Sequence, residues 1–184
     1  MGASPEVPLS ANTGYGYVGP ASLLSLYLAG LRLDRRVYAE VSTVSTATHQ
    51  CLGVTALAAV GYGFAVATWT GTVAPAAILL LILVDFGRLL FETSMAWLVG
   101  AKLLGREVGF GGVLRPLALA RAPEGLFAVL ALSDVLVPLR HVLSIYLLVA
   151  FVVAIRASFR CGLPLALGLA AAVFAISRAL LAAI

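Results

Sequence analysis

The sequence predicts an all-α fold: a polytopic integral membrane bundle of about five transmembrane helices, preceded by an amphipathic helix on the membrane surface. Three observations predict this class. The 184 residues are 62% hydrophobic and only 11% charged, whereas about a quarter of the residues in soluble domains are charged. Five apolar segments follow one another along the chain. The basic residues lie between these segments instead of forming one patch, a distribution typical of membrane-protein loops and not of a nucleic-acid partner.

Residues 1–20 predict a flexible N-terminal tail, because they are rich in glycine, proline and serine and carry little charge. They have neither the basic start nor the apolar core of a signal peptide. Gly14, Gly16 and Gly19 match the pattern G-x-G-x-x-G. No predicted strand precedes them and no βαβ unit follows, so we expect no dinucleotide cofactor.

Residues 21–46 predict an amphipathic juxtamembrane helix. Leucine, valine and tyrosine side chains share one broad face, and charged residues gather near the end of the stretch. We expect Arg32, Arg35 and Arg36 to contact an anionic membrane surface, where each arginine contributes roughly 1 kcal/mol. A solvated linker helix is the alternative.

Residues 47–184 predict the transmembrane domain. Its apolar segments lie near 49–69, 75–103, 123–137, 139–156 and 163–183. A helical span needs about 20 residues. The third segment is therefore short, and we expect it to be tilted, extended or re-entrant. Pro123 and Pro138 bracket it, and proline favours helix ends.

The basic residues predict the orientation of the bundle. Nine of them fall on one side of a five-span arrangement: Arg32, Arg35, Arg36, Lys102, Arg106, Arg115, Arg121, Arg156 and Arg160. The other side holds Arg140 and Arg178. Because basic loops stay in the cytoplasm, we expect a cytoplasmic N-terminus and a C-terminus outside. The arginine-, alanine- and glycine-rich composition favours a prokaryotic cytoplasmic membrane.

The second apolar segment carries three charges, Asp85, Arg88 and Glu92. A helix advances about 100° per residue, so all three lie on one face, with Arg88 i+3 from Asp85 and i,i+4 to Glu92. Charges inside a membrane are expensive, so this face must point into the bundle or into water. Three interpretations stay open: an internal ion-pair clamp, a path for protons or ions, and a contact with a partner subunit.

The remaining polar residues indicate no enzyme and no metal site. Cys51 and Cys161 lack metal-ligand spacing and are expected to be small core residues. His49 and His141 flank predicted spans, where histidines are usually solvated. No serine, histidine and aspartate follow a nucleophile motif. We therefore expect no catalytic residue, no metal and no cofactor.

Two stretches carry a family resemblance. LRLDRRVYAEVSTVSTATHQCLGVTALAAVGYGFA resembles the start of the first span in bacterial members of the Yip (Ypt/Rab-interacting) membrane protein family. FGGVLRPLALARAP resembles the segment before that family's third span. The resemblance covers roughly residues 22 to 183 and implies five helices, a cytoplasmic N-terminus and the opposite C-terminus.

The resemblance implies a non-enzymatic protein with a membrane-organising or adaptor role, in contact with the bilayer and with a second copy or another membrane protein. Eukaryotic relatives act with Rab-type GTPases, but this sequence lacks their Asp-Leu-Trp-Gly-Pro signature, so a GTPase partner is not expected. The charges of the second segment leave two alternatives. One is a small ion- or proton-coupled transporter or channel, and the other is an accessory subunit of a larger membrane complex.

Overall fold

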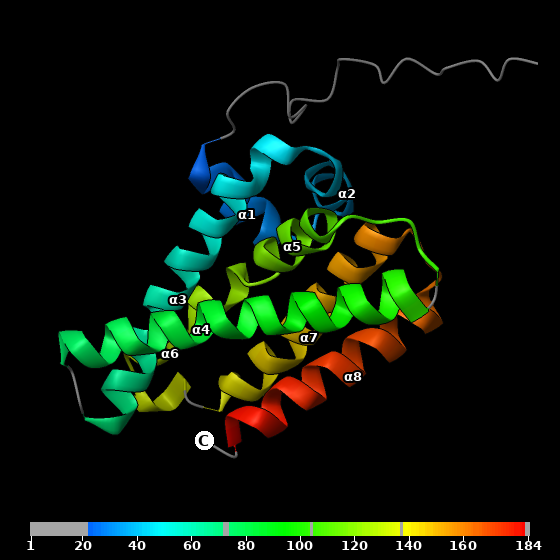
Figure 1. Cartoon of the computed structure of the whole chain (residues 1–184). Coiled ribbons are helices and arrows are strands. Elements are labelled where there is room, and N and C mark those ends of the chain that lie inside the picture. Colours follow the sequence, from blue (N-terminus) through cyan, green and yellow to red (C-terminus); the bar gives the residue numbers. More distant parts are fainter. Residues whose placement is uncertain (1–21, 72–73, 104, 137, 183–184) are drawn as a thin grey trace, which may run out of the picture.

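The computed structural model describes residues 22–71, 74–103, 105–136 and 138–182. The predicted tail, residues 1–20, lies outside the described residues. The described part is helical, which confirms the all-α prediction (Figure 1). The α-helices are α1 Leu23–Leu31, α2 Arg35–Thr43, α3 Thr48–Thr70, α4 Pro75–Trp97, α5 Phe110–Leu119, α6 Phe127–Leu130, α7 Leu139–Phe159 and α8 Leu163–Ala182. Shorter turns are the 3₁₀ helices η1 Ser45–Ala47, η3 Ala122–Leu126 and η4 Asp134–Leu136 and the π-helix η2 Leu98–Leu103.

Two helices of the described chain are long and apolar enough to cross a membrane. One is Ser45–Thr70, which joins η1 to α3, and the other is Leu139–Phe159, which is α7. Helix α4 has the same 23-residue length as α3, but it carries the three predicted intramembrane charges. The apolar part of α8 is the shorter stretch Leu163–Ser177. The prediction of membrane-spanning helices is thus confirmed in part.

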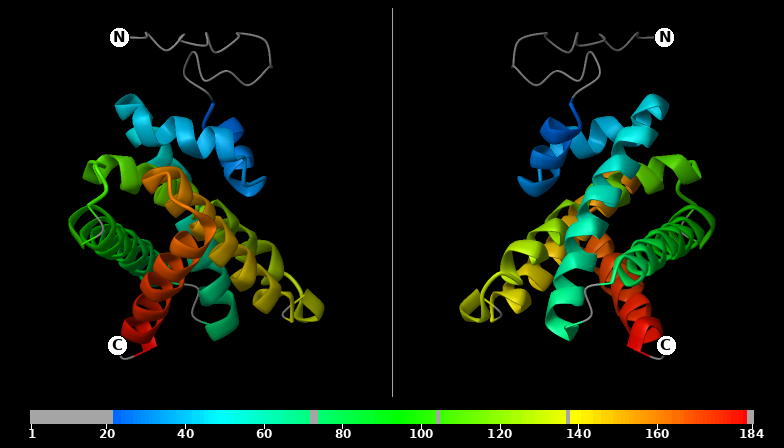
Figure 2. Two further views of the ribbon diagram at one scale, coloured as in Figure 1. Left: turned by 90° about the vertical axis from the view of Figure 1, so that its right-hand side faces the viewer. Right: turned by 90° about the vertical axis from the view of Figure 1, so that its left-hand side faces the viewer.

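The helices run between two ends of the molecule. Figure 1 places α1, α2 and the start of α5 at one end and the far end of α8 at the other, and both views of Figure 2 agree. The α3–α4 connection lies at the same end as the far end of α8 (Figure 2). Helix α4 packs against α3, α5 and α8, and α7 packs against α5 and α8. The arrangement brings the polar face of α4 to the middle of the bundle.

The predicted helix over residues 21–46 is two helices. Helix α1 ends at Leu31, and Leu33 adopts a left-handed φ of 54°. Asp34 then caps α2 by accepting a hydrogen bond from the Arg36 amide at 3.0 Å. Aspartate is among the best N-cap residues, so a second helix starts here instead of the first continuing.

The two helices use their apolar residues differently. Helix α1 exposes Leu23, Leu24 and Leu28. In α2, Tyr38 and Val41 are fully buried, and the helix packs on α5 and α7. The apolar face of α2 therefore contacts protein, whereas α1 leaves three leucines exposed on the surface.

The predicted third span, near residues 123–137, is not one continuous helix. It consists of η3, the four-residue helix α6 and, after a turn, η4. Pro123 lacks an amide hydrogen, and tighter 3₁₀ bonds such as Glu124 amide to Arg121 carbonyl, 2.8 Å, replace the α-helical pattern. Helix α5 leads directly into this region, so the chain from α5 through η3 and α6 is a helical segment interrupted near Arg121, which we call the broken third path.

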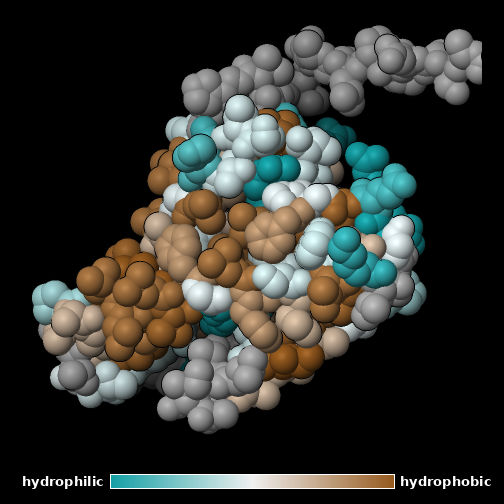
Figure 3. All heavy atoms as spheres, in the orientation of Figure 1, coloured by the Kyte–Doolittle hydropathy of each residue, from teal (hydrophilic) through white to brown (hydrophobic). Residues whose placement is uncertain are grey.

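The molecule exposes apolar side chains and buries charges. Exposed large apolar side chains on α3, α4, α7 and α8 include Leu57, Val60, Leu79, Leu80, Leu83, Val142, Ile145, Leu163 and Leu167. Figure 3 shows hydrophobic residues gathered over the first half of α4, with hydrophilic residues toward the opposite side of this view. A soluble domain seldom exposes so many large apolar side chains together, which agrees with the two helices that are long and apolar enough to cross a membrane.

Two glycines let α3 approach η3 closely. A Cβ atom added at Gly61 would lie 2.8 Å from the carbonyl oxygen and 2.9 Å from the Cα atom of Gly125. These are backbone atoms, which cannot rotate away as a side chain does. The two small residues thus let α3 pack directly against η3, which is part of the broken third path.

We expect Gly61→Ala to lower the thermal unfolding temperature in detergent, because the new methyl group must push η3 away from α3. Overpacking of this kind costs about 1–3 kcal/mol. The control is Gly87→Ala on α4, where an added Cβ meets nothing within 4 Å. It should leave stability unchanged or raise it by up to about 1 kcal/mol through helix propensity. Equal unfolding temperatures for wild type and Gly61→Ala would contradict the close approach.

Candidate functional site

The charged face of α4 points into the protein, as the spacing predicts. Asp85, Arg88 and Glu92 are 3%, 8% and 2% exposed. An Arg88 Nη2 to Asp85 Oδ1 distance of 3.3 Å and an Arg88 Nε to Glu92 Oε1 distance of 3.6 Å join them along the helix. Arginine can hold both carboxylates because its guanidinium offers five donors in a rigid fork.

Two further buried residues complete the site, and sequence reasoning missed both. Arg121 follows α5 and Glu124 lies in η3; they are 2% and 3% exposed. The Arg121 Nη1 atom lies 3.2 Å from Asp85 Oδ1 and 2.8 Å from Glu124 Oε1. Arg121 also pairs with Glu92, and Arg88 pairs with Glu124. We call these five residues the ion cluster.

The broken third path is what places Arg121 and Glu124 on the ion cluster. Because successive residues of a 3₁₀ turn eclipse at i and i+3, the two side chains project to the same side. In a straight α-helix Pro123 could not donate the backbone hydrogen bond that its position requires, because proline has no amide hydrogen. The chain forms the 3₁₀ turn η3 there instead. The sequence had placed Arg121 in a cytoplasmic loop. The only signal in the sequence for this role is that the second apolar segment carries two acidic residues and only one arginine, so a second base is needed from elsewhere in the chain.

The ion cluster is compact and unequal in charge. It contains three carboxylates and two guanidiniums, so a fully ionised cluster is one unit negative. A cavity of about 10 Å³ lies beside it, walled by cluster residues and by Leu147, Phe151 and Phe174. This volume is about the least that holds one water molecule. The carboxylates and guanidiniums therefore contact one another directly, and the cavity beside them is no larger than one water molecule.

Arg115 is a second internal guanidinium. It is 8% exposed, and its Nε and Nη2 atoms donate to the carbonyl oxygens of Val41 and Ser42, each at 2.6 Å. These carbonyls belong to the last turn of α2, where helix carbonyls lack intrahelical donors. Arg115 thus fixes α2 onto α5. With Arg121 and Arg115 inside the protein, two of the nine predicted cytoplasmic loop charges serve internal contacts.

The structure does not bring the other predicted contact residues to the ion cluster. Arg32, Arg35 and Arg36 are exposed around the α1–α2 turn. Arg35 lines a separate cavity with Arg156 and Arg160. Beside this turn the phenol of Tyr38 is buried, which raises its pKa well above the ordinary value, so it stays a neutral hydrogen-bond donor to the Gly30 carbonyl at 3.4 Å.

The cysteines and histidines form no metal site in the described part of the chain. Cys51 and Cys161 are both buried free thiols. Among the described residues no group of three or more histidine, cysteine, aspartate or glutamate side chains is arranged to hold a metal ion.

The fold and the site define an all-α protein with two candidate membrane-spanning helices and a buried ion cluster on a third long helix. Comparison with protein families, with curated proteins and with solved structures found no match to this chain.

Proposed function

We propose that this chain is an integral protein of a prokaryotic cytoplasmic membrane, of Yip type, with a membrane-organising or adaptor role and no catalysis of its own. The observation that carries the proposal is the inverted distribution of side chains. Large apolar residues face outward on α3, α4, α7 and α8, while five charged side chains close on one another inside. Such a protein is stable in lipid, where exposed apolar side chains are favourable and the internal charges are paired with one another.

Five crossings of the bilayer are consistent with this arrangement. The crossings would be α3, α4, the broken path through α5, η3 and α6, then α7 and α8. The α3–α4 connection and the far end of α8 lie at the end opposite to α1 and α2 (Figure 2). Arg121 and Glu124 give the broken path a reason to lie at membrane depth, because irregular backbone is tolerated there only when it is buried in protein.

The α1–α2 pair supplies the surface for an organising role. Arg32, Arg35 and Arg36 are exposed beside the exposed leucines of α1. Basic residues next to an apolar face bind an anionic leaflet. The partners are then the bilayer itself and a second copy or another membrane protein. The proposal includes no GTPase partner, because the sequence lacks the Asp-Leu-Trp-Gly-Pro signature of the relatives that act with Rab-type GTPases.

The topology gives the direct test. A reporter fused after Ile184 is expected to be outside the cytoplasm, and one inserted near Lys102 inside. Loop charges other than Arg115 and Arg121 still favour the cytoplasm for the α1–α2 side, seven to two, since two of the nine are internal. Paired alkaline phosphatase and fluorescent protein fusions in a bacterial membrane measure this. A cytoplasmic C-terminus would remove the five-crossing arrangement.

A proton-coupled transporter is the second candidate, favoured by the surplus carboxylate of the ion cluster. Three carboxylates share two guanidiniums, which favours binding of one proton by the cluster, and the cavity of about 10 Å³ beside it admits one water molecule. Proton or ion flux in reconstituted vesicles separates the two functions. Flux in wild type that disappears in a stable Asp85→Leu/Arg88→Leu/Glu92→Leu variant would establish transport. Its absence in both proteins supports the organising role.

A further inference from the structure

Three arginines from two helices converge on one cavity. Arg35 comes from the first residue of α2, Arg156 from the last turn of α7, and Arg160 from the C-cap of α7. The cavity has a volume of about 310 Å³, and its other walls are Val153, Ala157 and Cys161. No carboxylate lines it, and within the described residues none of the three guanidiniums takes part in a salt bridge.

The convergence is not explained by folding alone. Arg156 in the last turn of α7 is favoured by the helix dipole, whereas Arg35 is the first residue of α2, where the dipole of its own helix disfavours a cation. Arg160 adopts a left-handed φ of 47°, a conformation in which glycine is the usual C-terminal residue. The chain therefore places three positive charges around one cavity, and one of them, Arg160, occupies a backbone position that glycine would adopt more easily.

We propose that this cavity binds a phosphate-bearing anion, presented by the headgroup of an anionic phospholipid. Guanidinium groups donate paired hydrogen bonds to phosphate oxygens, and the three arginines would be relieved of their mutual repulsion by one phosphodiester. The apolar wall of Val153 and Ala157 suits the acyl-proximal part of a lipid. The lipid source rests on the proposed membrane location, whereas the anion chemistry rests on the arginines alone.

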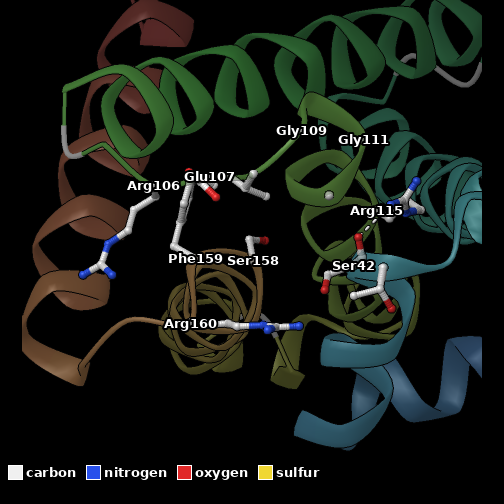
Figure 4. Close-up of a pocket in the computed structure, with 12 residues that line it drawn as sticks. Ser42, Arg106, Glu107, Gly109, Gly111, Arg115, Ser158, Phe159 and Arg160 are labelled. Carbon is white, nitrogen blue, oxygen red and sulfur yellow. Dashed lines mark hydrogen bonds between the residues drawn. The ribbon is translucent and has the colours of Figure 1, made fainter. Parts of the chain in front are cut away.

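The neighbouring larger cavity is the weaker candidate for this anion. It measures about 660 Å³, and Figure 4 shows Arg106, Arg115 and Arg160 at its edges. Glu107 also lines it, and Arg115 already donates to the Val41 and Ser42 carbonyls. A carboxylate and a committed guanidinium reduce its attraction for phosphate. Arg160 lines both cavities.

The test compares two variants of the full chain with the same change in net charge. One replaces the cavity arginines, Arg35→Gln/Arg156→Gln/Arg160→Gln. The other replaces three exposed basic residues that do not line the cavity and lie away from the α1–α2 turn, Lys102→Gln/Arg106→Gln/Arg140→Gln. Both are purified in detergent, checked for wild-type circular dichroism and titrated with phosphatidylglycerol or, separately, phosphatidylcholine. Native mass spectrometry counts the lipids retained.

We expect wild type and the control variant to retain phosphatidylglycerol in preference to phosphatidylcholine. The cavity variant is expected to bind it about tenfold or more weakly, since it loses three charge-assisted contacts. Inorganic phosphate is the second probe. Thermal stabilisation of wild type by phosphate, absent from the cavity variant, would keep the anion site and assign it to a free anion.

Equal lipid retention by all three proteins, with no stabilisation by phosphate, would overturn the proposal. An equal loss in both variants would also overturn it, because the attraction would then be a general effect of surface charge. Neither result depends on whether the chain organises membranes or on its topology, which the reporter fusions test separately.

Discussion

Replacing Arg121 by leucine is expected to cause the largest loss of stability of any single substitution in this protein. Its guanidinium pairs with Asp85, Glu92 and Glu124. Leucine in its place leaves three buried carboxylates with one base. Removing one partner of a buried ionic network typically costs about 3–5 kcal/mol, because the remaining charges keep their desolvation penalty. Thermal or chemical unfolding in detergent, followed by circular dichroism, measures the loss.

Arg106→Leu is the matched control for this substitution. Arg106 is exposed and has no salt bridge among the described residues, so its replacement should change the free energy of unfolding by within about 0.5 kcal/mol. If Arg121→Leu unfolds at the same temperature as Arg106→Leu, the ion cluster does not hold α4 against η3. Arg121 would then lie in a loop, as the sequence alone indicates.

Arg88→Leu is expected to give the second-largest effect, and three substitutions together should reverse much of it. Arg88 also pairs with three carboxylates, Asp85, Glu92 and Glu124, so its loss alone should cost about 3–5 kcal/mol. In Asp85→Leu/Arg88→Leu/Glu92→Leu the remaining Arg121 and Glu124 still face each other at 2.8 Å. One balanced pair is left, and α4 becomes apolar. Unfolding temperatures of the two variants measure the recovery.

A double variant supplies the control for that recovery. Asp85→Leu/Glu92→Leu retains Arg88 and Arg121 against the single carboxylate of Glu124. It should be less stable than the triple variant, although it changes fewer residues, because it leaves one buried positive charge uncompensated. If stability followed the number of leucines and not the balance of charge, apolar packing on α4 would account for it. The ion cluster would then be no clamp.

Local patterns in the sequence correctly predicted those elements whose structure depends only on residues close to one another along the chain. The all-α class, the apolar helices α3 and α7 and the shared face of Asp85, Arg88 and Glu92 follow from hydrophobicity and from the fixed turn of a helix. The same reasoning failed where a local competitor decided the structure. Asp34 started a second helix within residues 21–46, and Pro123 broke the third apolar segment.

By itself, then, the sequence determined that this protein is helical, that it carries membrane-compatible helices and that three charges share one side of α4. Only the tertiary structure decided what those charges meet. Arg121 reaches Glu92 across 29 residues and Asp85 across 36. Arg115 reaches Ser42 across 73 residues. Helical periodicity fixes the direction of a side chain relative to its own helix, but which helix lies opposite depends on how the segments pack, and packing is a property of the whole chain.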